Sequence, residues 1–375
     1  MMTFGYQRVS RRSPCGICGK PDWCSTTRDH RITFCARSAT DADRISCSGW
    51  GVYYREIRHV PHQVYALQQN RPRSSRPNAL APVEIRDKVF KELIQFSPIF
   101  DHISLLSEEW VSLYQYLSRY GMLPKSALRR QKLAQSIDDA LAKDDALFRA
   151  LRGVPGFWRT SNGRLQVGGN YDYADDFLLI PFIGSNGLIQ ACQLKAIRKN
   201  SRTSPKYSWL SSIRQRDGCG PGTPLHYEGA LGFKGKTIET VLVTEGALKA
   251  ATCQSFLPDR YVVGNSGVAT SHQEIVRTAR YKALEIAFDA DCFANPHVAR
   301  ALASLIASRV REQLFLSCEQ PTRILKWDKR FKGIDDALIA GATVHYLDVP
   351  EWLKLLTPEC FDAASHQLAD ISPSK

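Results

Sequence analysis

The sequence predicts a mixed α/β fold, with an α/β arrangement in its second half and α+β character over the whole chain. Three observations predict it: cysteines cluster near the start, apolar residues recur at helical spacing between residues 83 and 152, and short strands alternate with helices after residue 237. The chain has 375 residues, of which 43% are hydrophobic, enough for two or three domains with at least one sizeable core. This composition excludes a disordered or fibrous protein.

Residues 1–59 predict a small metal-binding module, a zinc ribbon. Its cysteines follow the spacing C-x2-C-x5-C-x10-C, and Zn²⁺ prefers four tetrahedral nitrogen or sulfur ligands; they are Cys15, Cys18, Cys24 and Cys35. A module of about 50 residues with few large apolar side chains needs such a bound metal to fold. Cys47 or His30 could replace one of the four, and a set of reduced, unligated thiols is the alternative.

The start of the chain, its hydropathy and its cysteine content indicate the compartment in which the protein works. No apolar stretch follows the basic residues at the start, so no secretory signal is expected. No run of about 18 apolar residues occurs, so neither a transmembrane helix nor a membrane partner is expected. Eleven cysteines in such a chain predict metal binding or free thiols rather than a disulfide framework.

The elements are expected in the following order. Strand-like pieces lie at 32–34 and 52–54, and four prolines mark 60–82 as a flexible, partly extended linker. Residues 83–236 combine helices up to about residue 152, interrupted at Pro98 and Pro124, with a β-hairpin of strands 177–183 and 188–194. Residues 237–345 alternate between strands at 237–246, 261–267, 283–291 and 322–327 and helices at 247–256, 271–280, 296–314 and 335–342. The last of these helices precedes a C-terminal tail, residues 346–375.

Acidic residues follow the predicted parallel strands. Glu245 ends the first strand, Asp289 and Asp291 end the third, and Asp335 and Asp336 open the last short helix. Since parallel strands deliver their carboxyl ends to one edge of a sheet, these carboxylates are expected to lie together. Such a group repels itself unless divalent cations lie between its members, and hard oxygen ligands favour Mg²⁺ or Mn²⁺. Capping carboxylates are the alternative.

The formal net charge of +13 is carried by two segments. Residues 1–76 have a net charge of +8, and residues 195–216 hold seven basic and no acidic residues. Two basic patches on a near-neutral body are typical of a protein that binds nucleic acid, and the alternative for either is a solvated surface loop. In the second patch the expected nucleic-acid or nucleotide ligands are Lys195, Arg198, Lys199, Arg202 and Lys206. In the first, Trp23, Trp50, Tyr53 or Tyr54 could stack on bases, although core packing is the commoner role.

These residues resemble a known family. Residues 237–341 resemble the TOPRIM domain that bacterial primases share with topoisomerases, certain nucleases and the RecR recombination mediator: Glu245 matches its glutamate, Asp289 and Asp291 its DxD pair, and Asp335 or Asp336 its later acidic position. The segment before it resembles the primase core, with Pro181, Gly187, Lys195, Pro205-Lys206-Tyr207 and Ser211-Ser212 at the matching places. The cysteine module stands where primases carry their zinc-binding domain. The sequence resembles the primase-like proteins of plasmids, phages and integrative elements more closely than the chromosomal enzyme.

The resemblance implies a DNA primase that synthesises short RNA primers on a single-stranded DNA template from nucleoside triphosphates. Glu245, Asp289 and Asp291 would be catalytic and would hold the metal ions. Only about 30 residues follow the TOPRIM-like region, so a separate replicative helicase is the expected partner, and the bacterial cytoplasm, at the nucleoid, the expected location. The alternatives are a non-catalytic DNA-binding or recombination accessory protein with a role like that of RecR, and a TOPRIM nuclease.

Overall fold

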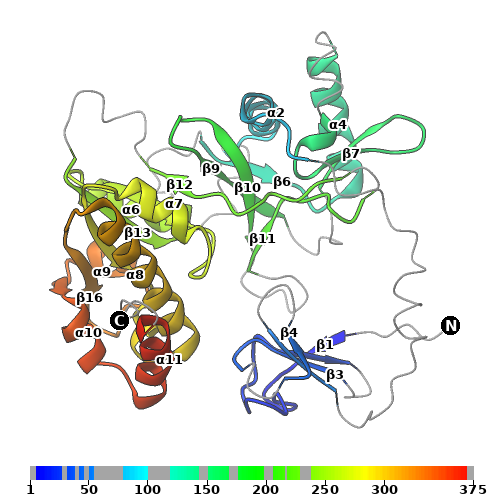
Figure 1. The fold of residues 1–375 in the computed structure, drawn as a ribbon. Helices are drawn as coiled ribbons and strands as arrows, with labels where there is room; N and C mark the ends of the chain where they lie inside the picture. The colour runs from blue at the N-terminus through cyan, green and yellow to red at the C-terminus, as the bar shows by residue number, and fades with distance from the viewer. Residues whose placement is uncertain are drawn as a thin grey trace. The chain divides into compact units, whose positions relative to one another are not determined.

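The computed structural model describes residues 6–27, 32–38, 42–45, 50–54, 79–99, 119–142, 151–168, 176–197, 206–215, 218–228 and 238–369. The chain is a mixed α/β protein that divides into two compact units, Met1–Arg73 and Ser74–Lys375 (Figure 1). Among the described residues, no helix is both long enough and apolar enough to cross a membrane.

The first unit is built on one antiparallel sheet in the order β1-β2-β3-β5-β4. Its strands are β1 (Tyr6–Arg8), β2 (Ser25–Thr27), β3 (Ile32–Cys35), β4 (Arg44–Ile45) and β5 (Gly51–Tyr54). The strands predicted at 32–34 and 52–54 are confirmed as β3 and β5, which pair with each other. Its buried cluster consists of Val9 and three cysteines, with Cys18, Ala36 and Tyr53 packed against it. Within the described residues of this unit the apolar core is small, which favours a bound metal or a cross-link as a further source of stability.

The second unit begins with helices packed on an antiparallel sheet. The sheet has the order β11-β10-β9-β6, and its strands are β6 (Gly121–Leu123), β9 (Phe177–Ile183), β10 (Ile189–Ala196) and β11 (Tyr207–Trp209). Helices α2 (Val83–Phe96) and α4 (Ala127–Leu141) share its core with the short 3-10 helix η3 (Leu151–Gly153) and the small hairpin of β7 (Phe157–Arg159) and β8 (Leu165–Val167). The predicted hairpin is confirmed as β9 and β10, joined by a turn in which Gly187 has a φ of +78°.

The helical prediction for residues 83–152 is right at its ends and wrong at 121–123. Residues Gly121–Leu123 form β6, which extends the sheet by pairing with β9. A three-residue strand leaves no periodic signal, and this one depends on a close approach: a Cβ at Gly121 would lie 3.0 Å from the carbonyl oxygen of Ser97. The predicted helical stretch around residues 105–117 lies outside the described residues.

The remainder of the second unit is built on a six-stranded sheet in the order β12-β14-β13-β15-β16-β17. The four inner strands are parallel, as predicted, and the two edge strands run antiparallel to them. The strands are β12 (His226–Tyr227), β13 (Thr240–Glu245), β14 (Tyr261–Asn265), β15 (Ala283–Ala287), β16 (Thr322–Lys326) and β17 (His345–Leu347).

Helices cover both faces of this sheet. Helices α6 (Ala247–Phe256) and α9 (Ile334–Ile339) pack on the face that carries Leu242 and Leu325. Helices α7 (His272–Thr278) and α8 (Pro296–Leu316) pack on the face that carries Val241 and Ile324. Alternate residues of each strand thus reach opposite cores, which is why these strands read as continuous apolar runs.

The helix predicted at 335–342 is confirmed as α9, but it is not the last one. Residues 346–375, expected as a tail, contain helices α10 (Val349–Lys354) and α11 (Pro358–Ala369). Asp348 and Glu351 form a capping box at the start of α10, and Trp352 is fully buried in the core that α8 shares with α11. The capping pattern of α10 is present in the sequence, but a helix of six residues is too short to show a helical period. Cys360, Ala363 and Ala364 of α11 do have helical spacing, and the sequence analysis missed it.

The two sheets of the second unit meet next to the start of α6. Ala247 and Leu248 pack in one cluster with Ile180 and Phe182 of β9. A buried polar bridge continues the contact: the backbone N–H of Ile183 donates to Nδ1 of His226 (3.1 Å). Nε2 of His226 lies 2.9 Å from Glu228, which also accepts from Arg119. The antiparallel sheet is therefore held beside the carboxyl edge of the parallel sheet.

Candidate functional site

The four predicted cysteines come together. Their Sγ atoms all lie within 4.8 Å of one another, with Cys18 and Cys24 3.7 Å apart and Cys24 and Cys35 3.8 Å apart. Four thiolates placed tetrahedrally at about 2.3 Å from a zinc ion are separated by about 3.8 Å, so the cluster fits a structural zinc. Cys47 and His30 lie outside the described residues.

The backbone around this cluster has the geometry of a metal-binding knuckle. Gly19 adopts a φ of +68°, and its N–H donates to the carbonyl of Cys15 at 2.8 Å. Opposite it, Arg37 donates to both carboxylate oxygens of Asp22 at 2.9 and 3.0 Å, which lowers the pKa of Asp22. This ion pair connects the segments that precede Cys24 and follow Cys35.

The aromatic residues of the first unit differ in their surroundings. Tyr53 packs against the cysteine cluster and donates to Ser38 at 3.3 Å, so it is structural. Trp23 is 69% exposed and has a φ of +65°, so core packing does not hold for this residue. Trp50 is half-buried, and the side chain of Tyr54 lies outside the described set.

Glu245 and Asp289 lie together at the carboxyl edge of the parallel sheet. Glu245 is the last residue of β13, and Asp289 follows the neighbouring strand β15 by two residues. The backbone N–H of Asp289 donates to Oε1 of Glu245 at 2.8 Å. Burial, together with the negative charge of Asp289, raises the pKa of Glu245 to about 7. Asp291 lies two residues further, in the 3-10 helix η4 (Ala290–Phe293), is exposed, and adds to this repulsion.

A lysine that the sequence analysis missed lies among these carboxylates. Lys249, on the first turn of α6, forms an ion pair with Asp289, and Lys332 lies 3.3 Å from the other oxygen of the same carboxylate. Burial alone would lower the pKa of Lys249, but the charges of Asp289 and Glu245 outweigh it and raise the pKa. The only available signal is its position four residues after Glu245, in a helix that begins at this sheet edge.

Asp335 and Asp336 contribute unequally. Burial raises the pKa of Asp335, against the attraction of Lys249, and its Oδ1 atom is buried without a hydrogen-bond partner. Asp336 is exposed. Gly333 has no room for a side chain, because a Cβ there would lie 2.1 Å from Oδ1 of Asp335 and 2.9 Å from Cε of Lys249. Asp335 is therefore the member of the pair that lies beside Lys249.

The carboxylates are less tightly gathered than the cysteines. Within the described part of the chain, the cysteine cluster is the one group of three or more metal-ligating side chains whose ligand atoms lie so close together. The ammonium group of Lys249 contacts Asp289 and neutralises part of the acidic charge. The hard oxygen donors, the unpartnered Oδ1 of Asp335 and the raised pKa of Glu245 are nonetheless what a divalent-cation site provides.

The hairpin of β10 and β11, which carries Lys195 and Lys206, lies near this acidic group. Lys195 of β10 is paired with Tyr207 of β11, and the ammonium groups of Lys195 and Lys206 lie 5.7 and 5.5 Å from the centre of the Tyr207 ring. Burial of the hydroxyl raises the pKa of Tyr207 to about 12, and the charges of Lys249, Asp335 and Asp289 also act on it. Tyr207 thus connects two of the predicted phosphate-binding lysines with the acidic edge. Arg198, Lys199 and Arg202 lie outside the described residues.

A buried side-chain amide lies beside Glu245. Asn265, the last residue of β14, is paired with Glu245 and is 1% exposed. Neither polar atom of its side chain has a hydrogen-bond partner, while its backbone carbonyl accepts from Gly246 at 2.8 Å. Gly246 has a φ of +85°, a region that side chains disfavour, which explains the glycine after Glu245.

Comparisons with known proteins complete the description of the site. No family model matches the chain, and no curated protein matches it either. Solved structures that it resembles include DNA primases. The Pseudomonas aeruginosa DNA primase domain is 14% identical over 78% of this chain and 97% of its own, with a TM-score of 0.48.

Two further structures have similar values. The DnaG primase catalytic domain bound to ssDNA is 13% identical, with a TM-score of 0.46 over 72% of this chain and 81% of that chain. The zinc-binding and RNA polymerase domains of the Aquifex aeolicus primase are 12% identical, with a TM-score of 0.45 over 99% of this chain and 91% of that chain. These are similarities of fold at low sequence identity.

Proposed function

We propose that the protein is a DNA primase, which synthesises short RNA primers on single-stranded DNA from nucleoside triphosphates. The observation that carries the proposal is the hydrogen-bonded pair of Glu245 and Asp289 at the carboxyl edge of a parallel sheet, bordered by the lysines of the β10–β11 hairpin. An acidic group beside a basic pair of strands can bind metal ions and phosphates at adjacent places. The carboxylates hold metal ions, and the lysines hold phosphates.

In this proposal residues 237–345 form a TOPRIM domain whose carboxylates hold Mg²⁺ or Mn²⁺. Glu245, Asp289 and Asp291 are the ligands, with Asp335 and Asp336 completing the acidic edge. Ions held there would supply the positive charge that neutralises the triphosphate and activates a 3′-hydroxyl, so that its attack on the α-phosphate could release pyrophosphate. Glu245 fits this role because it is held by the backbone of Asp289, and Asp335 because one of its oxygens has no other partner.

The hairpin and the first unit bind the polyanions. Lys195 and Lys206 contact phosphates of the nucleotide or the template as mobile point charges, and Arg198, Lys199 and Arg202 extend this surface. Residues 1–59, with their zinc, bind single-stranded template, and the exposed ring of Trp23 offers a face on which a base can stack. A separate replicative helicase completes the system. The work is done in the bacterial cytoplasm at the nucleoid, for a plasmid, phage or integrative element.

The test is a priming assay with the full chain. Purified protein is incubated with single-stranded DNA, Mg²⁺ or Mn²⁺ and labelled ribonucleotides, beside the double variant Asp289→Asn/Asp291→Asn. We expect short RNA products that the variant loses by at least about a hundredfold, a loss typical of removing a group that stabilises charge in the transition state. Asp328→Asn, which replaces an exposed carboxylate that forms an ion pair with Arg330, is the matched control and should retain full activity.

Other outcomes identify the alternatives. DNA binding without synthesis under all metal conditions contradicts the primase proposal and favours the accessory protein. Shortened input DNA that depends on the same two aspartates favours the nuclease. Circular dichroism of each variant confirms that loss of activity is not loss of fold.

A further inference from the structure

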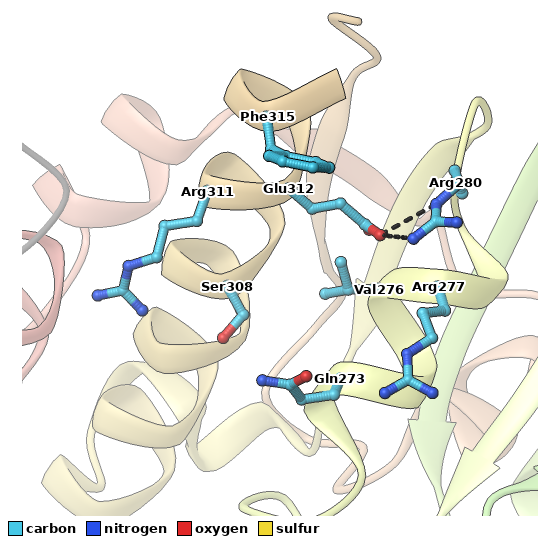
Figure 2. A pocket seen from close by; sticks show the side chains of 8 residues that line it. All are labelled: Gln273, Val276, Arg277, Arg280, Ser308, Arg311, Glu312 and Phe315. Atoms are coloured by element: carbon cyan, nitrogen blue, oxygen red, sulfur yellow. Dashed lines mark hydrogen bonds and ion pairs between the residues drawn. The ribbon is translucent and has the colours of Figure 1, made fainter. Parts of the chain in front are cut away.

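A groove between α7 and α8 is not used by the proposed primase chemistry. It has a volume of about 340 Å³. Figure 2 shows Arg277 on α7 and Arg311 on α8 with their guanidinium groups pointing away from each other, and Phe315 at one end of the groove. Arg280 bridges the helices by donating from Nε to Oε1 of Glu312 at 3.0 Å. The ion pair holds the groove's walls together.

The groove lies far from the acidic site. Helix α8 begins at Pro296, shortly after Asp291, and runs back along the sheet to Leu316. At about 1.5 Å per residue, Phe315 lies almost 30 Å from the start of the helix. The groove is therefore at the opposite end of α8 from the carboxylates, and a ligand bound there would not block them.

Its lining combines apolar surface with an excess of positive charge. Three arginines against one glutamate leave a net charge of +2, and no lysine lines the groove. Phe315 is 86% exposed, and the adjoining Leu314 is 64% exposed. The groove therefore offers apolar contact area and positive charge side by side.

The chemistry favours an acidic protein segment over nucleic acid. Arginine and aromatic residues are enriched in protein interfaces, whereas lysine is depleted, and arginine pairs with carboxylates in a two-point geometry. The groove has room for a few side chains rather than for a run of nucleotides. The negative charge of Glu312 in the lining is offset by its ion pair with Arg280, so it does not prevent the binding of an acidic ligand.

We propose that this groove binds an acidic segment of a partner protein. Carboxylates of the segment pair with Arg277 and Arg311, and one of its apolar side chains packs against Phe315 over the buried Val276. This inference goes beyond priming and does not depend on it. The groove is a docking surface that leaves the catalytic edge free.

The test uses the full chain and a library of short fluorescein-labelled peptides that combine Asp and Glu with Leu or Phe, beside a matched library with Asn and Gln instead. We expect binders only from the acidic library, read by fluorescence anisotropy. Arg277→Glu/Arg311→Glu should weaken their binding by about a hundredfold, because it replaces two attractions with repulsions. Phe315→Ala should weaken it by about tenfold, a common cost of removing an aromatic anchor.

Matched controls separate the groove from general charge and apolarity. Arg300→Glu changes an exposed arginine of α8 outside the groove, and Phe256→Ala removes a half-exposed ring of α6 on the other face of the sheet. Both should bind as the unaltered chain does. Unselective binding of both libraries, no binder at all, or variants without effect would each overturn the proposal.

Two further measurements decide which molecule binds in the groove. If the groove variants lose affinity for labelled oligothymidylate by the same factor, the groove binds nucleic acid and the proposal is wrong. If light scattering detects a dimer that the groove variants lose, the occupant is a second copy of this chain, and the proposal is again wrong. Priming by the groove variants, measured separately, reports on the proposed function alone.

Discussion

At the scale of single residues, Lys249 controls the charge balance of the acidic edge. The carboxylates of Glu245 and Asp289 repel each other, which contributes to the raised pKa of Glu245, and the ammonium group of Lys249 offsets part of that repulsion. Such a cation stabilises the protein before metal binds, and it also competes with the metal for the same oxygens. Lys249 therefore has opposite effects on the stability of the free protein and on its affinity for divalent ions.

We expect Lys249→Met to lower the stability of the metal-free protein by about 1–3 kcal/mol, less than a fully buried pair because the lysine is partly exposed. Added Mn²⁺ should then raise the melting temperature of the variant more than that of the unaltered chain. Thermal unfolding with and without Mn²⁺ measures both effects. Lys332→Met is the control, because Lys332 is largely exposed and its pair is worth little. If Mn²⁺ raised the melting temperatures of Lys249→Met and the unaltered chain equally, this account would be contradicted.

At the scale of elements, the sequence predicts those helices and strands that depend mainly on residues nearby in the chain. The strand and helix of β13 and α6 follow from continuous apolar runs and a glycine, and α6 begins and ends at the predicted residues. β6 and the position of Lys249 could not be predicted, because each depends on a contact made by another segment. Likewise Glu245 and Asp289 could be placed at one edge from the order of strands, but their hydrogen bond could not.

One such contact is the buried bridge between β9 and β12. Burial alone would raise the pKa of Glu228, but His226 and Arg119 outweigh it and lower the pKa. A carboxylate with a lowered pKa stabilises the fold above its unfolded pKa of about 4.3, and this contribution is lost as the pH falls through the folded value. We therefore expect Glu228→Gln to lose stability at pH 7 and to show a flatter decline in stability below about pH 4.5. Urea unfolding at a series of pH values measures this, with the exposed Glu319→Gln as a control that should follow the unaltered chain.

Helix α10 allows a second test at this scale. Trp352 is fully buried among α8 and α11, so Trp352→Ala leaves a cavity and should lower the free energy of unfolding by about 3–5 kcal/mol. Phe361→Ala on α11 removes a ring that is about half exposed and should cost about 1 kcal/mol or less. Urea unfolding compares the two. Equal losses would mean that α10 does not belong to the core of the second unit.

At the scale of the whole molecule, the two units differ in the interactions that stabilise them. The second unit has large apolar cores on both faces of its parallel sheet. The first has a buried cluster of Val9 and three cysteines. We expect a metal held by the four cysteines to stabilise the first unit, whose described apolar core is small, whereas the second unit is stabilised by its own large apolar cores.

Removal of zinc should therefore unfold Met1–Arg73 and leave Ser74–Lys375 folded. We expect about one zinc per chain by elemental analysis, and a strong chelator or Cys15→Ser/Cys18→Ser should abolish it. Limited proteolysis of the metal-free protein should then degrade the first unit to a stable fragment that begins near residue 74, because an unfolded segment is cleaved where a folded one is protected. Cys318→Ser, in the second unit, is the matched control and should keep both zinc and protease resistance. Degradation of both units together would contradict their independence, and a fully resistant first unit without zinc would mean that its sheet folds without metal.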